Sequence, residues 1–324
     1  MRRIALFFVM LIFFVTPVRA QVCTASISSI NFGSIAPATD SSASASGSVT
    51  VSCSGFLLTP FVRACVSIGT GSGGTSYAPR YALNGASTLA YNLYVDSAGS
   101  TIWGSRRSGT YAAVAIDIPL TIQLGTATGS RTVPFYGRVP TGQTTLVAGT
   151  YLSTFAGATQ AEMTYQAYVL TPPDCSTLAA NSKALSFTVS ANVINDCTLA
   201  ATNINFGTAG VLNGTLAATG TLSVSCTSND AYSIALSAGS GTGASVADRR
   251  MTRSGGSEQV RYQLYQNAAY STPWGDGTSG AMPVTGTGTG TGVSHAITVY
   301  ARVLPQTTPS AGSYTDTIIA TITY

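Results

Sequence analysis

Short segments in which apolar and polar residues alternate recur along almost the whole chain. Residues 49–51, 91–95, 120–124 and 297–299 are examples, rich in Val, Ile, Thr and Tyr and separated by clusters of Gly, Ser and Thr. Alternation with a period of two is typical of strands that bury one face. No segment of about a dozen residues carries a convincing helical stripe. The pattern predicts an all-β fold of antiparallel, immunoglobulin-like β-sandwiches.

The pattern occurs twice. Residues 23–53 begin C-T-A-S-I-S-S-I-N-F-G-S and end G-S-V-T-V-S-C, and residues 197–226 begin C-T-L-A-A-T-N-I-N-F-G-T and end G-T-L-S-V-S-C. Further along, residues 91–104 match residues 262–275 without a gap. A period of roughly 170 residues indicates a duplicated domain and not a solenoid of short repeats.

The first residues have the features of a secretory signal peptide. Arg2 and Arg3 precede an apolar run over residues 4–15, and V-R-A at residues 18–20 provides a small-x-small cleavage site. The run is too short for a membrane span. The expected layout is a signal peptide at 1–20, an N-terminal domain at 21–183, a connecting strand at 184–196 and a C-terminal domain at 197–324.

Charge is sparse. Three of the 15 basic residues lie in the signal peptide, which leaves 12 against 11 acidic residues, and only 8% of the chain is charged. A nearly neutral protein has no basic field with which to bind nucleic acid or anionic membranes. We therefore expect an exported protein, soluble or assembled on a surface, with no nucleic-acid partner.

Six cysteines behind a signal peptide predict disulfides, which persist in oxidising compartments. The repeat makes two of the pairs equivalent and leaves one further pair. Closing a loop of about 30 residues stabilises a fold by about 3–4 kcal/mol. No cysteines have zinc-ligand spacing, and the single histidine, His295, lies far from all of them, so we expect no metal. The predicted pairs are Cys23–Cys53, Cys197–Cys226 and Cys65–Cys175.

Two segments suggest that the second domain is incomplete. Residues 184–194 alternate strictly, as a strand does when it completes a sheet, and the first domain can use this strand in cis. In the second domain we find no such segment after the last strand, so we expect an open apolar groove that another chain must fill. The residues expected at the groove edge are Ile318, Ala320, Ile322 and Tyr324.

The Cys…N-F-G…S-V-S-C opening, the Y-x-L-Y…W-G stretch and the A-G-x-Y…I-x-Y ending resemble the spore coat protein U family, whose members include subunits of archaic (Csu-type) chaperone–usher pili. The two-domain layout resembles the tip adhesin of such pili. The resemblance implies a periplasmic pilus chaperone, an outer-membrane usher and an adjacent subunit that donates a β-strand. It also implies export through the periplasm to the fimbrium tip, with roles in cell adhesion and biofilm formation.

Two sequence features add to this interpretation. Only Gln21 and Val22 precede Cys23 after the signal peptide, so we expect a subunit that accepts a strand without donating one. Several loops of the first domain also carry apolar residues where the second has polar ones. These side chains either form adhesive loops for an abiotic or host surface or fill a larger core. They are Phe56, Leu57, Leu58, Phe61, Tyr111, Val114, Leu146 and Val147.

Other functional classes have little support. Residues 69–74 satisfy G-x-G-x-x-G, but no helix follows, so no nucleotide cofactor is expected. There is no G-x-S-x-G motif, His295 has no evident carboxylate partner, and nothing pairs two carboxylates as a glycosidase requires. We expect no catalytic residues and no enzyme. The competing interpretation is a structural pilus or coat subunit without adhesive function.

Overall fold

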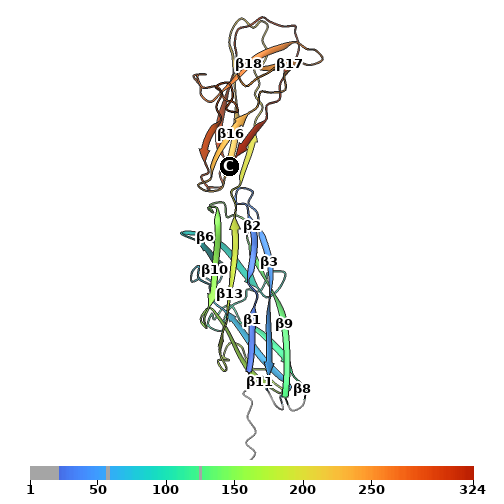
Figure 1. The fold of residues 1–324 in the computed structure, drawn as a ribbon, viewed down its shortest axis with the longest axis vertical. Coiled ribbons are helices and arrows are strands. Elements are labelled where there is room, and N and C mark those ends of the chain that lie inside the picture. The colour runs from blue at the N-terminus through green and yellow to red at the C-terminus, as the bar shows by residue number, and fades with distance from the viewer. Residues whose placement is uncertain (1–21, 56–58, 124–125) are drawn as a thin grey trace, which may run out of the picture.

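The computed structural model describes residues 22–55, 59–123 and 126–324, and no helix occurs among them. None of these residues therefore forms a helix that could cross a membrane. Figure 1 shows an elongated molecule in which two β domains are joined end to end, with the last residue close to the junction. The all-β fold with two tandem domains confirms the prediction from the repeat.

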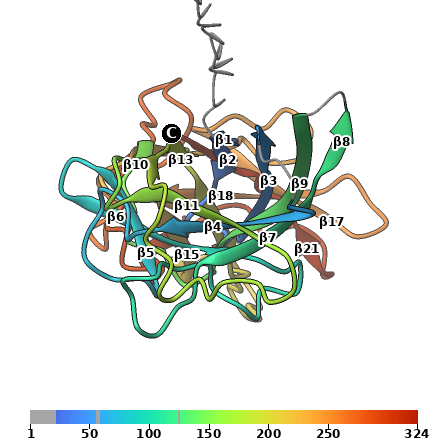
Figure 2. The ribbon, with the colours of Figure 1, turned by 90° about the horizontal axis from the view of Figure 1, so that it is seen from below.

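Domain 1 packs two sheets face to face around one core, as Figure 2 shows from the domain-1 end of the molecule. The larger sheet has the order β1-β3-β9-β6-β5-β10-β13-β2, with β8 beside β9, and the smaller is β12-β11-β4-β7. The strands are β1 Val22–Ile27, β2 Ile30–Ile35, β3 Ala43–Ser54, β4 Phe61–Ile68, β5 Arg80–Asn84, β6 Ser87–Tyr94, β7 Val114–Pro119, β8 Thr121–Gln123, β9 Thr126–Val139, β10 Gly149–Ala156, β11 Ala161–Tyr168, β12 Lys183–Ala184 and β13 Ser186–Val193.

Domain 2 repeats this arrangement with fewer strands. Its sheets are β14-β15-β20-β18-β17-β21 and β19-β16-β22, which match β1-β3-β9-β6-β5-β10 and β7-β4-β11 of domain 1 one for one. Only β8, β12, β13 and β2 lack an assigned counterpart in the described residues. The strands are β14 Cys197–Ala201, β15 Leu216–Cys226, β16 Ala231–Leu236, β17 Arg249–Arg253, β18 Gln259–Tyr265, β19 Val284–Thr287, β20 His295–Val303, β21 Tyr314–Thr315 and β22 Ala320–Thr323.

The cysteines pair as the repeat predicted. Cys23 lies directly opposite Cys53 across β1 and β3, Cys197 lies opposite Cys226 across β14 and β15, and Cys65 of β4 is bonded to Cys175. Each equivalent pair therefore ties the first strand of its domain to the second strand of the same sheet.

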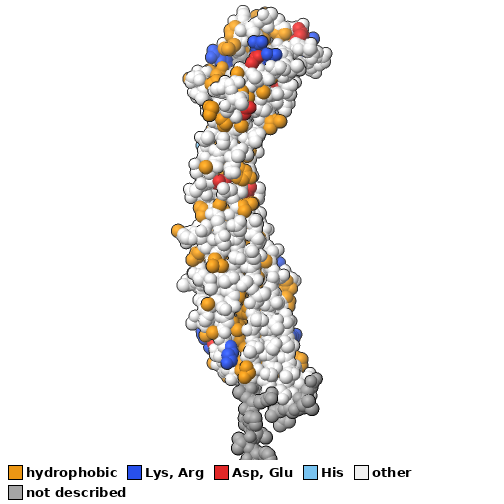
Figure 3. Space-filling model, in the orientation of Figure 1, with side chains coloured by type: hydrophobic (Ala, Val, Ile, Leu, Met, Phe, Trp, Pro, Cys, Tyr) orange, Lys and Arg blue, Asp and Glu red, His pale blue; other side chains and the backbone are white. Residues whose placement is uncertain are grey.

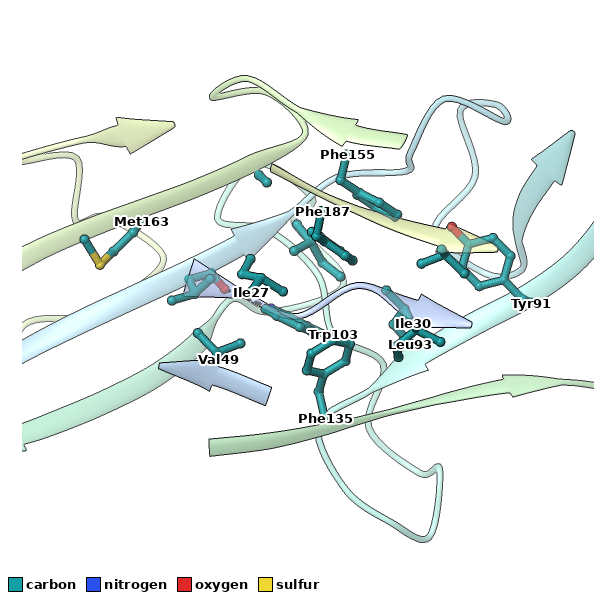
Figure 4. Packing of buried hydrophobic residues seen from close by; sticks show 14 of the residues in the cluster. Ile27, Ile30, Val49, Tyr91, Leu93, Trp103, Phe135, Phe155, Met163 and Phe187 are labelled. Atoms are coloured by element: carbon teal, nitrogen blue, oxygen red, sulfur yellow. Dashed lines mark hydrogen bonds between the residues drawn. The ribbon is translucent and has the colours of Figure 1, made fainter. Parts of the chain in front are cut away.

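A buried tryptophan marks the centre of each core. Trp103 packs against Phe135 and Phe187 (Figure 4), and its indole Nε1 donates to the carbonyl of Val66 at 2.9 Å. Trp274 is equally buried in domain 2 and donates to Ile234 at the same distance. The polar end of each indole is thus satisfied, as buried tryptophans require.

Each domain also buries an arginine beside its tryptophan. The Arg80 guanidinium donates to the carbonyls of Gly69 and Trp103 at 2.9 and 2.6 Å, and the Arg249 guanidinium donates to those of Ser237 and Trp274 at 2.9 and 2.8 Å. Burial lowers the pKa of Arg80 to about 10 and also lowers that of Arg249. The duplicated arginines tie a strand of the larger sheet, β5 or β17, to the residue that follows β4 or β16 of the smaller sheet.

The junction between the domains is short and hydrogen-bonded. β13 ends at Val193 and β14 begins at Cys197, so the two domains are joined by only a few residues. The backbone N–H of Thr39 donates to Asp196 at 3.0 Å, and Val147 forms a bridge with Ser228 of domain 2. The loop that contains Val147 therefore faces domain 2 and not solvent at the far end.

Candidate functional site

The first candidate site is defined by β13, which fills a gap in the wall of domain 1. β13 runs antiparallel to β10 and parallel to β2, and it lies between them. Its inward side chains are all buried in the core, and the Phe187 ring stacks on that of Phe155 with centroids 4.4 Å apart (Figure 4). The inward residues are Phe187, Val189, Ala191 and Val193.

Domain 2 has a groove of about 550 Å³ at the corresponding place. One wall is the segment of Tyr314, Asp316 and Ile318, which matches Tyr151, Ser153 and Phe155 of β10 in the sequence repeat. The other wall contains Ile204 and Phe206, which match Ile30 and Phe32 of β2, and its floor is formed by core residues of the two sheets. This hollow is called the domain-2 groove below.

Side chains along the domain-2 groove are more exposed than their equivalents in domain 1. Ile30 and Phe32 of β2, beside β13, are buried, whereas Ile204 and Phe206 are only half-buried. Residues 203–209 also belong to no strand, although their counterparts form β2. A groove that has apolar side chains on both walls and is flanked by backbone that forms no sheet ladder is the kind of surface to which an extended chain binds as an added strand.

The predicted groove edge is placed only in part. Ile318 and Ala320 line the domain-2 groove, whereas Ile322 is paired with Ile234 in β16 and Tyr324 is half-exposed beyond β22. Ile322 and Tyr324 are not among the residues that line the groove, and their place at its edge stays a prediction. The opposite wall was missed, although the repeated I-N-F-G that forms it is visible in the sequence.

One carboxylate lies on the groove wall. Oδ2 of Asp316 accepts a hydrogen bond from the Tyr262 hydroxyl at 2.7 Å, and Oδ1 accepts from the backbone N–H and the hydroxyl of Ser240 at 2.6 and 2.8 Å. Burial of the phenol, together with this bond to a carboxylate, raises the pKa of Tyr262 strongly. The tyrosine is therefore protonated and acts as a donor to Asp316.

The second candidate site lies at the end of domain 1 that is far from domain 2. The strand ends there are joined by the pairing of Phe61 with Tyr168 and Pro119 and by a bond from the Leu120 N–H to the Pro60 carbonyl. Five apolar side chains at this end are exposed, and they are called the distal apolar surface below. They are Val22 (39% exposed), Phe61 (37%), Ile122 (57%), Val169 (56%) and Leu170 (91%).

A polar network supports this surface from beneath. The Arg63 guanidinium forms a two-pronged ion pair with Asp117 at 2.8 and 2.6 Å, and the Tyr168 hydroxyl donates to the same carboxylate at 2.9 Å. The hydrogen bond from Arg63 holds the pKa of Asp117 below its usual value. The Tyr168 ring in turn stacks on Phe61. Phe61 is therefore held on paired strands, and Val169 and Leu170 follow directly after the end of β11.

Of the five predicted adhesive residues that the structure describes, four do not share this surface. Phe56, Leu57 and Leu58 lie outside the described residues. Leu146 is 2% exposed and packs in the domain-1 core, so its placement on an exposed loop tip is wrong. Val147 is bonded across the junction to Ser228 and is likewise misplaced.

Of the others, Tyr111 packs against Tyr77 and Val114 packs on the core, both at the end of the β4–β7 ladder opposite Phe61. Phe61 alone among the described candidates lies on the distal apolar surface. Ile122, Val169 and Leu170 were missed, although the apolar pair V-L before T-P-P is a visible signal. On the face in Figure 3, charged side chains are few and scattered over both domains.

A buried carboxylate anchors the connection from β11 to β13. Glu162 of β11 accepts hydrogen bonds from Arg106 at 3.0 Å and from the Ser182 hydroxyl at 2.7 Å, and it pairs with Arg107 at 2.9 Å. The Cys65–Cys175 disulfide and the pairing of β12 with β11 hold the same connection. The third disulfide therefore holds the long connection that delivers β13 in register in domain 1.

Replacing Glu162 with Gln is expected to destabilise domain 1 at neutral pH by about 2 kcal/mol, because two charge-assisted hydrogen bonds are weakened. Burial raises the pKa of Glu162, but the bonds from Arg106 and Ser182 outweigh it, so the pKa lies below its usual 4.5. The stabilisation of domain 1 by the ionised Glu162 is therefore fully present above pH 4.5 and is lost as the pH falls through the lower pKa of the folded state. The free energy of unfolding in urea should differ between wild type and variant at pH 7, and this difference should shrink at pH 3. An equal difference at both pH values would contradict a stabilising role for the ionised Glu162.

Comparisons with known proteins agree with the architecture. The model of the Spore Coat Protein U domain family matches residues 10–158 and 183–321. Protein U of Myxococcus xanthus is 33% identical over 131 residues, which cover 37% of this chain and 71% of that protein.

Among solved structures, similarity extends to a chain of the CsuC–CsuE chaperone–tip adhesion subunit pre-assembly complex from archaic chaperone–usher Csu pili of Acinetobacter baumannii. The TM-score is 0.54 at 17% identity, with 94% of this chain and 100% of that chain covered. This likeness shows a shared fold. With the family match over both halves of the sequence, it follows that the chain belongs to the Spore Coat Protein U domain family.

Proposed function

We propose that this protein is a pilus subunit whose domain 2 is completed by a β-strand from another chain. The observation that carries the proposal is the equivalence of the domain-2 groove to the place that β13 fills in domain 1. On this proposal a periplasmic chaperone first fills the groove, and an adjacent subunit replaces the chaperone strand at an outer-membrane usher. The solved complex with the same fold is named as that of a chaperone with a tip adhesion subunit.

The use of β13 within domain 1 supports a position at the tip of the fibre. Its four inward side chains are buried in domain 1, so this strand is not free to enter another subunit. The chain then accepts a strand through domain 2 and presents domain 1 outward, on the cell surface. The distal apolar surface lies at the leading end of such a fibre.

We propose that the distal apolar surface attaches the fibre to apolar abiotic or host surfaces and so supports biofilm formation. Five apolar side chains are exposed at this end of domain 1, among them Leu170 at 91% and Ile122 at 57%, and exposed apolar area often marks an interaction site. Nothing in this role calls for catalysis. The alternative, a structural subunit without adhesive function, offers no use for the cluster.

Replacing Ile122, Val169 and Leu170 together with Thr, Thr and Ser is expected to abolish attachment to polystyrene while pili still assemble. The three side chains are exposed, so folding should be little affected. The matched control is Leu152→Ser, which changes an apolar side chain that is 45% exposed on β10, away from this end. Fibres are counted by electron microscopy and bound cells by staining. Wild-type attachment by the triple variant, with normal fibre numbers, would rule out the adhesive role of this surface.

A further inference from the structure

The domain-2 groove differs from its domain-1 counterpart at one chemically decisive position. Ser153 of β10 lies directly opposite Val189 of β13, and both side chains are buried in the core of domain 1. The residue that matches Ser153 in domain 2 is Asp316, which lines the groove. A strand that enters the groove in the register of β13 therefore places one inward side chain directly beside a carboxylate.

The repeat fixes this equivalence by more than sequence. Leu152 pairs with Leu83 of β5, and Thr315 pairs with Thr252 of β17, so the neighbouring residues occupy the same register in the two sheets. The tyrosine beside each position is also conserved between the two copies. Tyr91 lies opposite Arg80 in domain 1, as Tyr262 lies opposite Arg249 in domain 2.

The carboxylate retains capacity to accept a further hydrogen bond. Oδ1 of Asp316 accepts from the N–H and hydroxyl of Ser240 and from the Thr317 N–H, at 2.6–2.8 Å, whereas among the described residues Oδ2 accepts only from Tyr262, at 2.7 Å. Each oxygen of an ionised carboxylate has about two acceptor sites, so Oδ2 has one left. A strand that covers the groove removes water from Oδ2, and an aliphatic side chain there would leave that bond unmade, which is costly in a buried site.

We propose that the domain-2 groove selects a partner strand with a hydrogen-bond-donating side chain opposite Asp316. The remaining inward positions, opposite Tyr314 and Ile318, take apolar side chains, as Ala191 and Phe187 do in domain 1. The occupant is thus a β-strand of another subunit whose apolar alternation is broken once by a hydroxyl or amide residue. This selection deepens the proposed function and rests on it. It also disfavours binding of β13 from a second copy of this chain, because β13 has Val189 at this position.

The test adds a strand to the full chain and compares two side chains of the same shape. A flexible linker as long as residues 166–183 is placed after Tyr324, followed by a copy of residues 184–194 in which the position of Val189 is either Val or Thr. Thr and Val differ by one hydroxyl in place of a methyl group. Each tail is built on the wild-type chain and on Asp316→Ser, which restores the residue of domain 1, and the melting temperature of domain 2 is measured for all four and for the untailed parents.

Both tails should raise the melting temperature of domain 2 in the wild-type chain. The Thr tail should exceed the Val tail by roughly 3–6 °C, the shift that one buried hydrogen bond produces in a domain of this size. In Asp316→Ser this advantage should disappear. Should that variant fail to fold, Asp316→Asn, which keeps the shape of the side chain, should at least reduce the advantage.

The outcomes separate the two proposals. If both tails stabilise domain 2 but Thr gives no advantage over Val, or gives the same advantage in Asp316→Ser, the selection by Asp316 is wrong while strand acceptance stands. If neither tail raises the melting temperature of domain 2, strand acceptance itself is wrong and the selection falls with it.

Discussion

Replacing Phe187 with Ala is expected to destabilise domain 1 by about 3–5 kcal/mol, the usual cost of removing a buried aromatic ring. The Phe187 ring stacks on Phe155 at 4.4 Å and on Trp103 at 6.5 Å, so its loss opens a cavity where β13 meets the core. Because β13 holds β10 and β2 together, the loss should affect this whole wall of domain 1. Domain 2 should keep its stability, because it contributes no side chain to this cluster.

Pulse proteolysis in urea, with fragments identified by mass spectrometry, reports each domain separately. The matched control is Ser190→Ala, which lies on the outward face of the same strand and should change stability by no more than about 0.5 kcal/mol. An effect of Phe187→Ala as small as that of Ser190→Ala would mean that β13 is not an integral strand of domain 1.

Replacing Arg249 with Met is expected to destabilise domain 2 by about 3 kcal/mol or more, since hydrogen bonds to a charged group contribute about 1.5–3 kcal/mol each. The variant removes donors from the carbonyls of Ser237, Leu236 and Trp274, which lie between the sheets. Arg80→Met should do the same to domain 1, where the guanidinium also donates to Asn92 at 2.8 Å.

The control for this pair is Arg261→Met. Its side chain is 65% exposed and lies 3.6 Å from Asp248, so the ion pair is weak and its loss should cost less than about 1 kcal/mol. Urea unfolding of the three variants gives the comparison. If Arg249→Met and Arg261→Met lower the free energy of unfolding equally, the hydrogen bonds of the buried arginine do not stabilise domain 2.

Much of the fold could be predicted from the sequence because the information is local or repeated. Alternation identified the strands, and the two copies of the cysteine-flanked segment fixed both equivalent disulfides and left Cys65 for Cys175. The strict alternation of residues 184–194 likewise indicated a strand able to complete a sheet. These features depend on the two-residue period of a strand and on the positions of the cysteines in the two copies. Neither requires knowledge of which loops meet in space.

The candidate sites were harder to predict because they depend on which ends of strands lie together. Leu146 and Phe61 look alike in the sequence as apolar loop residues, yet Leu146 is buried in the core and Phe61 lies at the distal end. The buried arginines were also missed, since a charged residue in an A-x-R segment gives no sign of burial. Aligning the two copies over residues 78–83 and 247–252 would have shown that Arg80 and Arg249 coincide.

The most direct test of the incomplete second domain compares backbone amide exchange in two equivalent segments of one chain. Residues 30–35 form β2 beside β13, whereas residues 204–209 border the domain-2 groove and belong to no strand. Hydrogen–deuterium exchange should be slower at 30–35 than at 204–209 by about a hundredfold or more. Equal protection of the two segments in the isolated chain would contradict an open groove in domain 2.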